Sequence, residues 1–480
     1  TARAGLKFSA KDARNLGVDI TPIEIEAALK TVKKGAAPGP DGIPMEFYMA
    51  LGPRISHMLA LVANAVRDHG ELSVSQRTGI IIMLWKGKEK GAMRAQRPIT
   101  LSNRLPALIE AVIAERLGRV LPGCIRADQT GFLAKDGRRM HENIVKAQDA
   151  LAYARDKQIP ACAISIDFLK AFDRCSRDLL FALYDIMCGG EPGSNQPLTR
   201  WMRALMAKHT RRVLVNGELS TPFELEDGMP QGSILSPFHF VLFAESLGVM
   251  LHSAVKGIPT PSVGERLSTM RYADDLNLVL PPSEVAVAMD VCDIWSAATG
   301  MARNGTKTEG MWIGSEWRRD TPWTRTHKSQ SPGDSCYANA RIDGARLTWL
   351  PPGSSIRVLG IDVGYSVSSD TVWTNIAGKM LTQLRLWQLV GLSLLARVLV
   401  LKVMVWSRAF FVASYHEPPP HILLFLTRAT AMFLQHGCLP VGVSLDTPAR
   451  DLCARAPFRA GIASRPNAEG GLAMWSPMLH

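Results

Sequence analysis

The sequence has few of the features that mark a secreted or membrane-bound protein. Its eight cysteines show no paired C-x-x-C spacing, so no zinc knuckle is predicted. Several of them lie in apolar runs, which is typical of reduced, buried thiols in an intracellular protein. The N-terminus shows no signal peptide, and the first residue is Thr1 rather than methionine. We therefore expect an intracellular protein, and the chain to be a fragment of a longer one.

Uninterrupted apolar runs of membrane-spanning length are also missing. The first candidate, residues 233–251, contains His239 and Glu245. The second, residues 391–412, contains three cationic side chains. Charges at this spacing make a bilayer crossing unfavourable, so both segments are predicted to be buried helices, and no membrane partner is expected.

The composition favours a polyanionic partner. Lys and Arg number 55 against 43 Asp and Glu, which gives a formal net charge of +12 over 480 residues. A chain of this length is too long for one simple core and predicts two or three subdomains. The basic excess favours nucleic acid, although an excess of this size also occurs in ordinary soluble proteins.

The most informative stretch is Met270–Leu280, which reads as a hairpin with two acidic residues, Asp274 and Asp275, at its tip. Adjacent carboxylates repel each other and need a nearby cation to stay ionised at neutral pH. Mg²⁺ is the natural cation for clustered carboxylate oxygens, and it leaves open positions for substrate phosphates. The alternative is a solvated Asp-Asp turn without chemistry.

A third carboxylate and a glycine-rich loop accompany the hairpin. Residues 161–168 alternate as a strand does and bring Asp167 to its C-terminal end. Between the two acidic strands, Gly228 and Gly232 allow close approach of the backbone to a ligand, and Ser233 is predicted to cap an apolar helix running to about Leu251. Carboxylates from separate strands can hold two metal ions that activate a hydroxyl and stabilise a leaving oxygen.

The order of these elements resembles the palm of a reverse transcriptase. Asp167-Phe168 and Ala171-Phe172-Asp173 come first, Gly-Met-Pro-Gln-Gly-Ser follows from Gly228, and Tyr-Ala-Asp-Asp ends at Asp275. Further segments are similar to the LINE-type, non-LTR retrotransposon enzymes. They are Lys33–Gly42, Arg97–Asn103, Asp128–Phe132 with Arg138, Asn304–Thr308 and Glu469–Leu472.

The resemblance implies an α+β, right-hand polymerase with fingers, a palm built on an antiparallel sheet, and a helical thumb. We expect an N-terminal extension over residues 1–75, fingers and palm over 76–370, a thumb over 371–440, and the start of a C-terminal linker region over 441–480.

The same resemblance implies roles for individual residues. Asp167, Asp274 and Asp275 are expected to be catalytic and, with Phe168, to hold two Mg²⁺ ions, or Mn²⁺. Lys307 is expected to protonate or neutralise the leaving pyrophosphate; the alternative is a surface lysine. The expected substrate-binding residues are Arg97, Arg138, Phe172, Gln231 and Gly232, with Phe172 excluding a ribose 2′-hydroxyl unless it is a core residue. The expected nucleic-acid-binding residues are Lys33, Lys34, Arg397 and Lys402, with thumb-bundle core as the alternative for the last two.

The implied activity is RNA-directed DNA synthesis, in which a DNA primer 3′-hydroxyl attacks a deoxynucleoside triphosphate opposite an RNA template. An endonuclease domain is expected elsewhere in the full-length protein, and the location is expected to be a nuclear or cytoplasmic ribonucleoprotein. Two alternatives stay open. One is a catalytically silent, nucleic-acid-binding scaffold of the same fold, and the other is a group II intron maturase-type reverse transcriptase, against which the Gly470-Gly471-Leu472 segment argues.

Overall fold

The computed structural model describes residues 7–85, 96–133, 136–262, 264–313, 341–342, 345–350, 354–364 and 367–452. The chain divides into two compact units, Thr1–Pro352 and Gly353–His480. This division falls earlier than the boundary at residues 370 and 371 expected from the sequence. Helices and sheets of both units confirm the α+β class. The Glu469–Leu472 segment lies outside the described residues.

A group of helices opens the first unit. These are α1 (Ala10–Gly17), α2 (Pro22–Thr31), α3 (Met45–Leu51), α4 (Pro53–His69) and α5 (Val74–Arg77). Helix α2 begins with a capping box, because the Thr21 hydroxyl accepts from the Glu24 N–H at 3.3 Å and the Glu24 carboxylate accepts from the Thr21 N–H at 2.9 Å. Helix α2 packs on α4 and on the long helix α6 (Arg104–Cys124).

The first sheet has the strand order β2-β1-β4-β5, with β6 also paired to β4. The strands are β1 (Thr78–Trp85), β2 (Gln96–Ser102), β4 (Thr210–Val215), β5 (Glu218–Leu219) and β6 (Phe223–Glu224). Strands β1 and β4 run parallel, and the other pairs are antiparallel. Asn216 and Gly217 both have positive φ at the β4–β5 turn, as the Asn-Gly sequence predicts.

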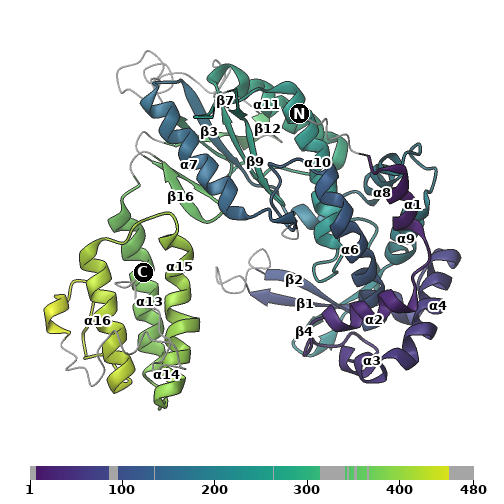
Figure 1. Ribbon diagram of the computed structural model, residues 1–480, viewed down its shortest axis with the longest axis horizontal. Helices are drawn as coiled ribbons and strands as arrows, with labels where there is room; N and C mark the ends of the chain where they lie inside the picture. Colours follow the sequence, from purple (N-terminus) through teal and green to yellow (C-terminus); the bar gives the residue numbers. More distant parts are fainter. Residues whose placement is uncertain are drawn as a thin grey trace. The chain divides into compact units, whose positions relative to one another are not determined.

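The second sheet carries the acidic residues and has the order β14-β11-β3-β10-β9. Its strands are β3 (Ala161–Ile166), β9 (Thr269–Tyr272), β10 (Asp275–Leu280), β11 (Glu309–Ile313) and β14 (Thr348–Trp349). Only the β11–β14 pair is parallel. Figure 1 shows this sheet apart from the strands β1, β2 and β4 within the first unit.

Helices cover the second sheet and join it to the rest of the first unit. Helix α7 (Met140–Asp156) packs on β9 and β11, α10 (Ser236–Ala254) on β9, and α11 (Pro282–Thr299) on β3 and β10. Helices α8 (Arg177–Met187) and α9 (Pro197–Met206) pack against each other, and α8 also packs on α10. Both β3 and β10 are almost entirely buried, which explains why most of their residues are apolar. Two short strands, β7 (Ile258–Pro259) and β8 (Arg266–Leu267), form a separate hairpin.

The second unit is a hairpin followed by helices. Strands β15 (Ser355–Val358) and β16 (Ile361–Gly364) precede α13 (Ser369–Trp387), α14 (Leu394–Val400), the π-helical segment η5 (Leu401–Trp406), α15 (Ser407–Ala413) and α16 (Pro420–His436). Helix α13 packs on both α15 and α16. In the described parts of the chain, no helix combines the length and apolar character that a bilayer crossing requires.

Candidate active site

The register of the second sheet brings two of the predicted carboxylates together. Strands β3 and β10 are antiparallel, with Leu276 opposite Ile166 and Asn277 opposite Ser165. The same register carried one step further places Asp275, the first residue of β10, opposite Asp167, which directly follows β3. Cross-strand neighbours lie within a few ångströms of each other, so residues far apart in the chain share one end of the sheet.

Asp274 lies in the tight turn next to this pair. Tyr272 and Asp275 are paired across β9 and β10, so Ala273 and Asp274 form the turn, with Ala273 at φ 53°. Burial and repulsion from Asp167 raise the pKa of Asp274. Asp275 is exposed as a residue, yet burial of its carboxyl group and the charges of Asp274 and Asp167 raise its pKa to about 6. The three acids therefore form one electrostatic cluster in which negative charge predominates.

Lys307 is the cation that this cluster does have. Its ammonium lies 3.2 Å from Oδ2 of Asp167, and the Asn304 side-chain amide donates to the same oxygen at 2.9 Å. Lys307 also lowers the pKa of both Asp274 and Asp275, although not enough to offset burial and repulsion. Lys307 thus contacts the carboxylates, and its role at a leaving pyrophosphate stays a prediction.

The donors at this end of the sheet suit a hard divalent cation. Carboxylate and carbonyl oxygens are the ligands that Mg²⁺ and Mn²⁺ take. Phe168 forms an isolated antiparallel bridge with Arg303, whose two hydrogen bonds run from Leu169 to Ala302 and from Asn304 to Asp167. The bridge therefore does not use the Phe168 carbonyl. Among the described residues, no three His, Cys, Asp or Glu side chains already form a metal-binding group.

The glycine-rich loop contacts Phe172 and Asp173, which follow Asp167 in the chain. The Met229 N–H donates to the Phe172 carbonyl at 2.7 Å, and the Gln231 side-chain amide lies 3.4 Å from Oδ1 of Asp173. The Phe172 ring is half-buried and stacks on Phe240, with centroids 4.5 Å apart. Phe172 thus has one face in the core and remains partly exposed beside the loop.

The loop also docks on the strand that carries Arg97. The Thr100 N–H donates to the Gln231 carbonyl at 2.7 Å. Gly232 has φ +122°, and a Cβ built there would lie 2.6 Å from the Thr100 carbonyl oxygen, so only glycine fits. Arg97 is exposed on this same strand, β2. The structure therefore joins the predicted positions Arg97, Phe172, Gln231 and Gly232 through backbone contacts.

Ser233 does not cap α10 as expected, because the helix begins at Ser236 with Leu235 in the N-cap position. The Ser233 hydroxyl instead accepts from the N–H groups of Leu235 and Ser236, at 3.2 and 3.3 Å, and donates to Glu110 at 2.8 Å. A hydroxyl three residues before the helix makes a turn of its own, which displaces the helix start.

Arg138 has a structural role that the sequence comparison did not predict. Its guanidinium donates to the carbonyls of Pro122, Ile125, Arg126 and Gln129 at 2.6 to 3.2 Å, and it pairs with Asp136 at 3.1 Å. Its side chain is only 12 % exposed. These contacts hold the connection after α6, and they correct the expectation of a substrate-binding arginine.

Arg397 is likewise engaged inside its own unit. Its guanidinium donates to the carbonyls of Leu392, Leu434 and Gln435 at 2.8 to 3.1 Å, which neutralises the C-terminal end of α16. This corrects the expectation that Arg397 lies along a nucleic acid. Lys402 is half-buried in η5, and Lys33 and Lys34 are exposed after α2. Nucleic-acid contact by these three lysines stays a prediction.

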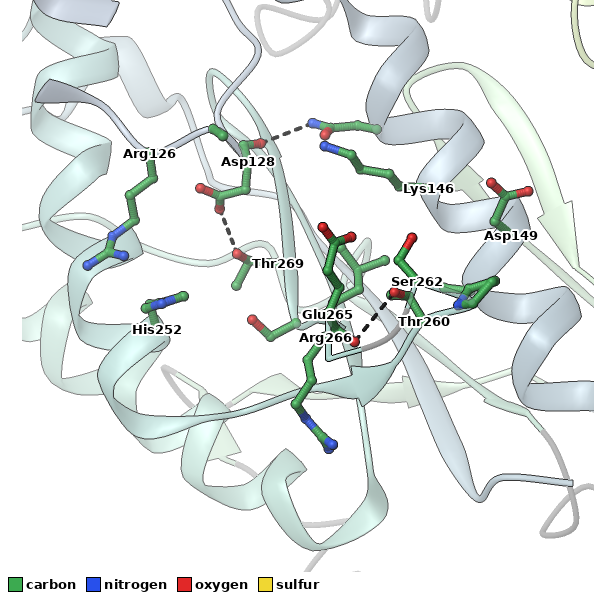
Figure 2. A pocket seen from close by; sticks show the side chains of 16 residues that line it. Arg126, Asp128, Lys146, Asp149, His252, Thr260, Ser262, Glu265, Arg266 and Thr269 are labelled. Carbon is green, nitrogen blue, oxygen red and sulfur yellow. Dashed lines mark hydrogen bonds between the residues drawn. The ribbon is translucent and has the colours of Figure 1, made fainter. Parts of the chain in front are cut away.

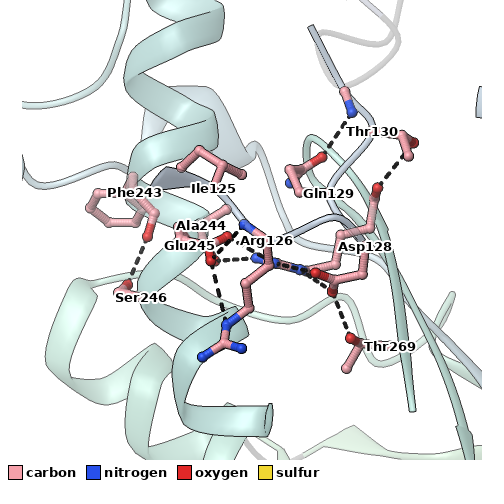
Figure 3. Close-up of polar contacts among 12 residues, drawn as sticks. Ile125, Arg126, Asp128, Gln129, Thr130, Phe243, Ala244, Glu245, Ser246 and Thr269 are labelled. Atoms are coloured by element: carbon pink, nitrogen blue, oxygen red, sulfur yellow. Dashed lines mark hydrogen bonds and ion pairs between the residues drawn. The ribbon is translucent and has the colours of Figure 1, made fainter. Parts of the chain in front are cut away.

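A buried ion cluster behind the acidic turn was not predicted. Arg271, on β9, is 2 % exposed and makes two bonds to Asp128 at 2.7 and 2.8 Å, with Glu245 at 2.8 Å on its other side. Figure 3 shows Asp128 and Glu245 in this network, with Thr269 bonded to Asp128. Burial alone would raise the pKa of Asp128, but Arg271 outweighs it and lowers that pKa. A resemblance over Asp128–Phe132 was the only sequence signal for this cluster.

A cavity of about 880 Å³ lies at the other end of β9 from the acidic turn. Asp128 and Thr269 line one wall, joined by a hydrogen bond in Figure 2. Its charged lining is mixed in sign, with Arg126, Lys146, Asp149, Glu265 and Arg266. Its lining does not include the three clustered acids.

Comparison with known protein families gives a match to the part of the chain that contains most of these site residues. Residues 86–363 match the family model described as "Reverse transcriptase (RNA-dependent DNA polymerase)". The chain is 25 % identical over 308 residues to "Transposon TX1 uncharacterized 149 kDa protein" of Xenopus laevis. The aligned region covers 64 % of the chain and 23 % of that protein.

Two relatives from Drosophila melanogaster have more specific names. The chain is 27 % identical over 242 residues to "Probable RNA-directed DNA polymerase from transposon BS", covering 48 % of the chain and 25 % of the relative. It is 25 % identical over 274 residues to "RNA-directed DNA polymerase from mobile element jockey", covering 56 % and 28 %. The matched region thus spans about a quarter of the length of these relatives.

Proposed function

The chain belongs to the reverse transcriptase (RNA-dependent DNA polymerase) family, on its LINE-type, non-LTR side, and on that premise we propose that it extends a DNA primer on an RNA template. One observation carries the proposal. The register of β3 and β10 sets Asp167 opposite Asp275. Asp274, in the adjacent turn, is close enough that its negative charge and those of the other two acids repel one another. Carboxylates that raise one another's pKa by repulsion are stabilised when cations bind between them, so this cluster is a candidate cation site.

We propose that the second sheet is the palm, that the first sheet belongs to the fingers, and that the helices of the second unit form the thumb. The sheet order of the acidic strands and the docking of the Gln231 loop on β2 support the first two assignments. The helical character of residues 369–436 supports the third.

Asp167, Asp274, Asp275 and the Phe168 carbonyl would hold the divalent ions, Mg²⁺ or Mn²⁺. When bound, such ions lower the pKa of an attacking hydroxyl and stabilise the charge on a leaving phosphate. Lys307, exposed beside Asp167, would neutralise charge on departing pyrophosphate. Phe172 would meet the sugar of the incoming deoxynucleotide, with Gln231 against its base and Arg97 against its phosphates.

The substrates we propose are an RNA template, a DNA primer and deoxynucleoside triphosphates. The names of the relatives support a transposon protein over an intron maturase. An endonuclease domain outside this chain and a place in an intracellular ribonucleoprotein, nuclear or cytoplasmic, belong to the same proposal.

The test is primer extension on poly(rA)·oligo(dT) with Mg²⁺ or Mn²⁺, comparing the wild type with Asp274→Asn. We expect synthesis to fall to background while fluorescence anisotropy shows unchanged binding of the template–primer duplex. The matched control is Asp290→Asn, which changes an exposed aspartate on α11 and should leave synthesis intact. Equal synthesis by the wild type and Asp274→Asn would remove Asp274 from the mechanism. Binding without synthesis by the wild type would favour a silent scaffold.

A further inference from the structure

The turn that carries Asp274 has a strained backbone. Ala273 adopts φ 53°, a left-handed conformation that residues with a Cβ rarely adopt. Such strain persists only where the surrounding structure holds it in place. The residues around Ala273 should therefore include the groups that supply this restraint.

The segment Asp128–Gly131 runs beside β9 and reaches this turn. The Arg271 N–H donates to the Asp128 carbonyl at 2.8 Å, and the Thr130 N–H donates to the Arg271 carbonyl at 3.0 Å. Gln129 and Arg271 are thereby paired in a parallel bridge. A Cβ on Gly131 would lie 2.5 Å from the Ala273 nitrogen, so the two backbones pack as closely as glycine permits.

The Gln129 side chain grips the peptide groups of the turn. Its Oε1 accepts from the Ala273 N–H at 2.9 Å and from the Gly131 N–H at 3.0 Å, and its Nε2 lies 3.5 Å from the Ala273 carbonyl. Gln129 is 0 % exposed, so water cannot replace these bonds. A buried amide that binds both the N–H and the C=O of one residue restrains both of its backbone dihedral angles.

Further contacts to Arg271 fix the position of the segment that carries Gln129. Asp128, adjacent to Gln129, holds the Arg271 guanidinium, and Glu245 holds it from the other side (Figure 3). The Asn143 side chain donates to the Arg271 carbonyl at 2.9 Å. Because Arg271, Glu245 and Asn143 are buried, these bonds hold the segment and β9 in one register.

We propose that Gln129 is a positioning residue for polymerisation: it holds Ala273 in its left-handed conformation and so aims the Asp274 carboxylate toward Asp167. The inference rests on the proposed function, because aiming Asp274 matters only if that carboxylate takes part in the reaction. Gln129 does not touch the reacting atoms and acts through the turn.

The test uses Gln129→Leu, which keeps the side chain's bulk without its hydrogen bonds, and Gln129→Glu, which keeps the acceptors but not the amide donor. Hydrogen exchange of the peptide containing Ala273 is measured first. We expect the Ala273 amide to exchange about 10-fold faster in Gln129→Leu, because a buried bond has been lost, with an intermediate rate in Gln129→Glu.

Steady-state synthesis supplies the second readout. We expect Gln129→Leu to lower kcat while KM for deoxynucleotide changes little, since the defect lies in the aim of Asp274. Adding Ala273→Gly to Gln129→Leu should restore part of kcat, because glycine adopts positive φ without strain. Gln129→Glu guards against a failure of the leucine variant to fold.

Asn64→Leu is the matched control. Asn64 binds the backbone of Ile20 in the same way, accepting from its N–H at 2.8 Å and donating to its carbonyl at 3.0 Å, but it lies on α4. Its loss should lower stability without changing exchange at Ala273 or kcat. Unchanged exchange in Gln129→Leu, or an equal loss of kcat in Asn64→Leu, would overturn the proposal. If the wild type synthesises no DNA, the polymerase proposal fails, while exchange at Ala273 still decides whether Gln129 holds the turn.

Discussion

The Lys307 ammonium lies 3.2 Å from Oδ2 of Asp167, and the Asn304 side-chain amide donates a hydrogen bond to the same oxygen. The lysine therefore occupies an oxygen that a divalent ion would use. It also lowers the pKa of the two neighbouring aspartates. Lys307 acts as the resident counterion of the cluster.

Replacing Lys307 with methionine should separate metal binding from synthesis. Without its positive charge the cluster becomes more negative, so Mn²⁺ should bind a few-fold more tightly; the effect is small because the lysine is 59 % exposed. Synthesis should slow, because charge on the pyrophosphate is no longer neutralised. Electron paramagnetic resonance of free Mn²⁺ and primer extension measure the two effects. Lys307→Arg keeps the charge and is the control; weaker Mn²⁺ binding in Lys307→Met would contradict the counterion role.

The raised pKa of Asp275 predicts how stability depends on pH in metal-free protein. Its folded pKa of about 6 lies above the ordinary value of 3.8. The folded state thus binds more protons between these values, so the contribution of Asp275 is fully present below the lower value and is lost as the pH rises through the higher one.

Asp275→Asn removes this titration. In EDTA, we expect the free energy of unfolding of the wild type to fall relative to Asp275→Asn between about pH 4 and about pH 7. Urea denaturation at several pH values measures the difference, and Asp290→Asn should follow the wild type. Parallel profiles for the wild type and Asp275→Asn would show that the carboxyl group is not perturbed.

Gly232 should tolerate no side chain, for two reasons that a pair of variants can separate. Gly232→Ala would strain a backbone at φ +122° and bring Cβ to 2.6 Å from the Thr100 carbonyl oxygen. Gly217→Ala strains a backbone at φ +88° with no atom within 4 Å of the new Cβ. We expect losses of about 2–4 kcal/mol for the first and about 1 kcal/mol for the second.

Urea denaturation measures both losses, and primer extension should show a defect for Gly232→Ala alone. Equal losses of stability in the two variants would mean that the loop moves away from β2 at little cost.

Phe172→Ala tests whether this ring limits the choice of sugar. Its stacking on Phe240 means that truncation should cost about 1–3 kcal/mol, less than for a fully buried ring. If the exposed part meets the sugar, ribonucleotide incorporation relative to deoxyribonucleotide should rise about 10-fold or more. Single-nucleotide extension measures the ratio. Phe240→Leu removes the stacking partner and controls for stability, and unchanged discrimination in Phe172→Ala would leave Phe172 with a core role alone.

Local sequence patterns determined several elements before any tertiary structure was considered. The alternation of residues 161–166, the apolar return strand after Asp275 and the capping box at Thr21 each produced the element expected. These features depend on side-chain periodicity and on contacts a few residues apart, so a window of sequence contains all the information they need. The order of the acidic segments likewise predicted the family that the comparison identified.

Only the tertiary structure decided which side chains remain available to a substrate. Arginine is a residue type that often binds ligands. The guanidinium groups of Arg138 and Arg397 instead donate hydrogen bonds to backbone carbonyls at two helix ends. The sequence alone assigned no role to Gln129, because its hydrogen-bond partner, Ala273, lies far away in the chain. A guanidinium or an amide bonds equally well to a carbonyl or to a ligand, and which of them it meets depends on distant segments that the fold brings together.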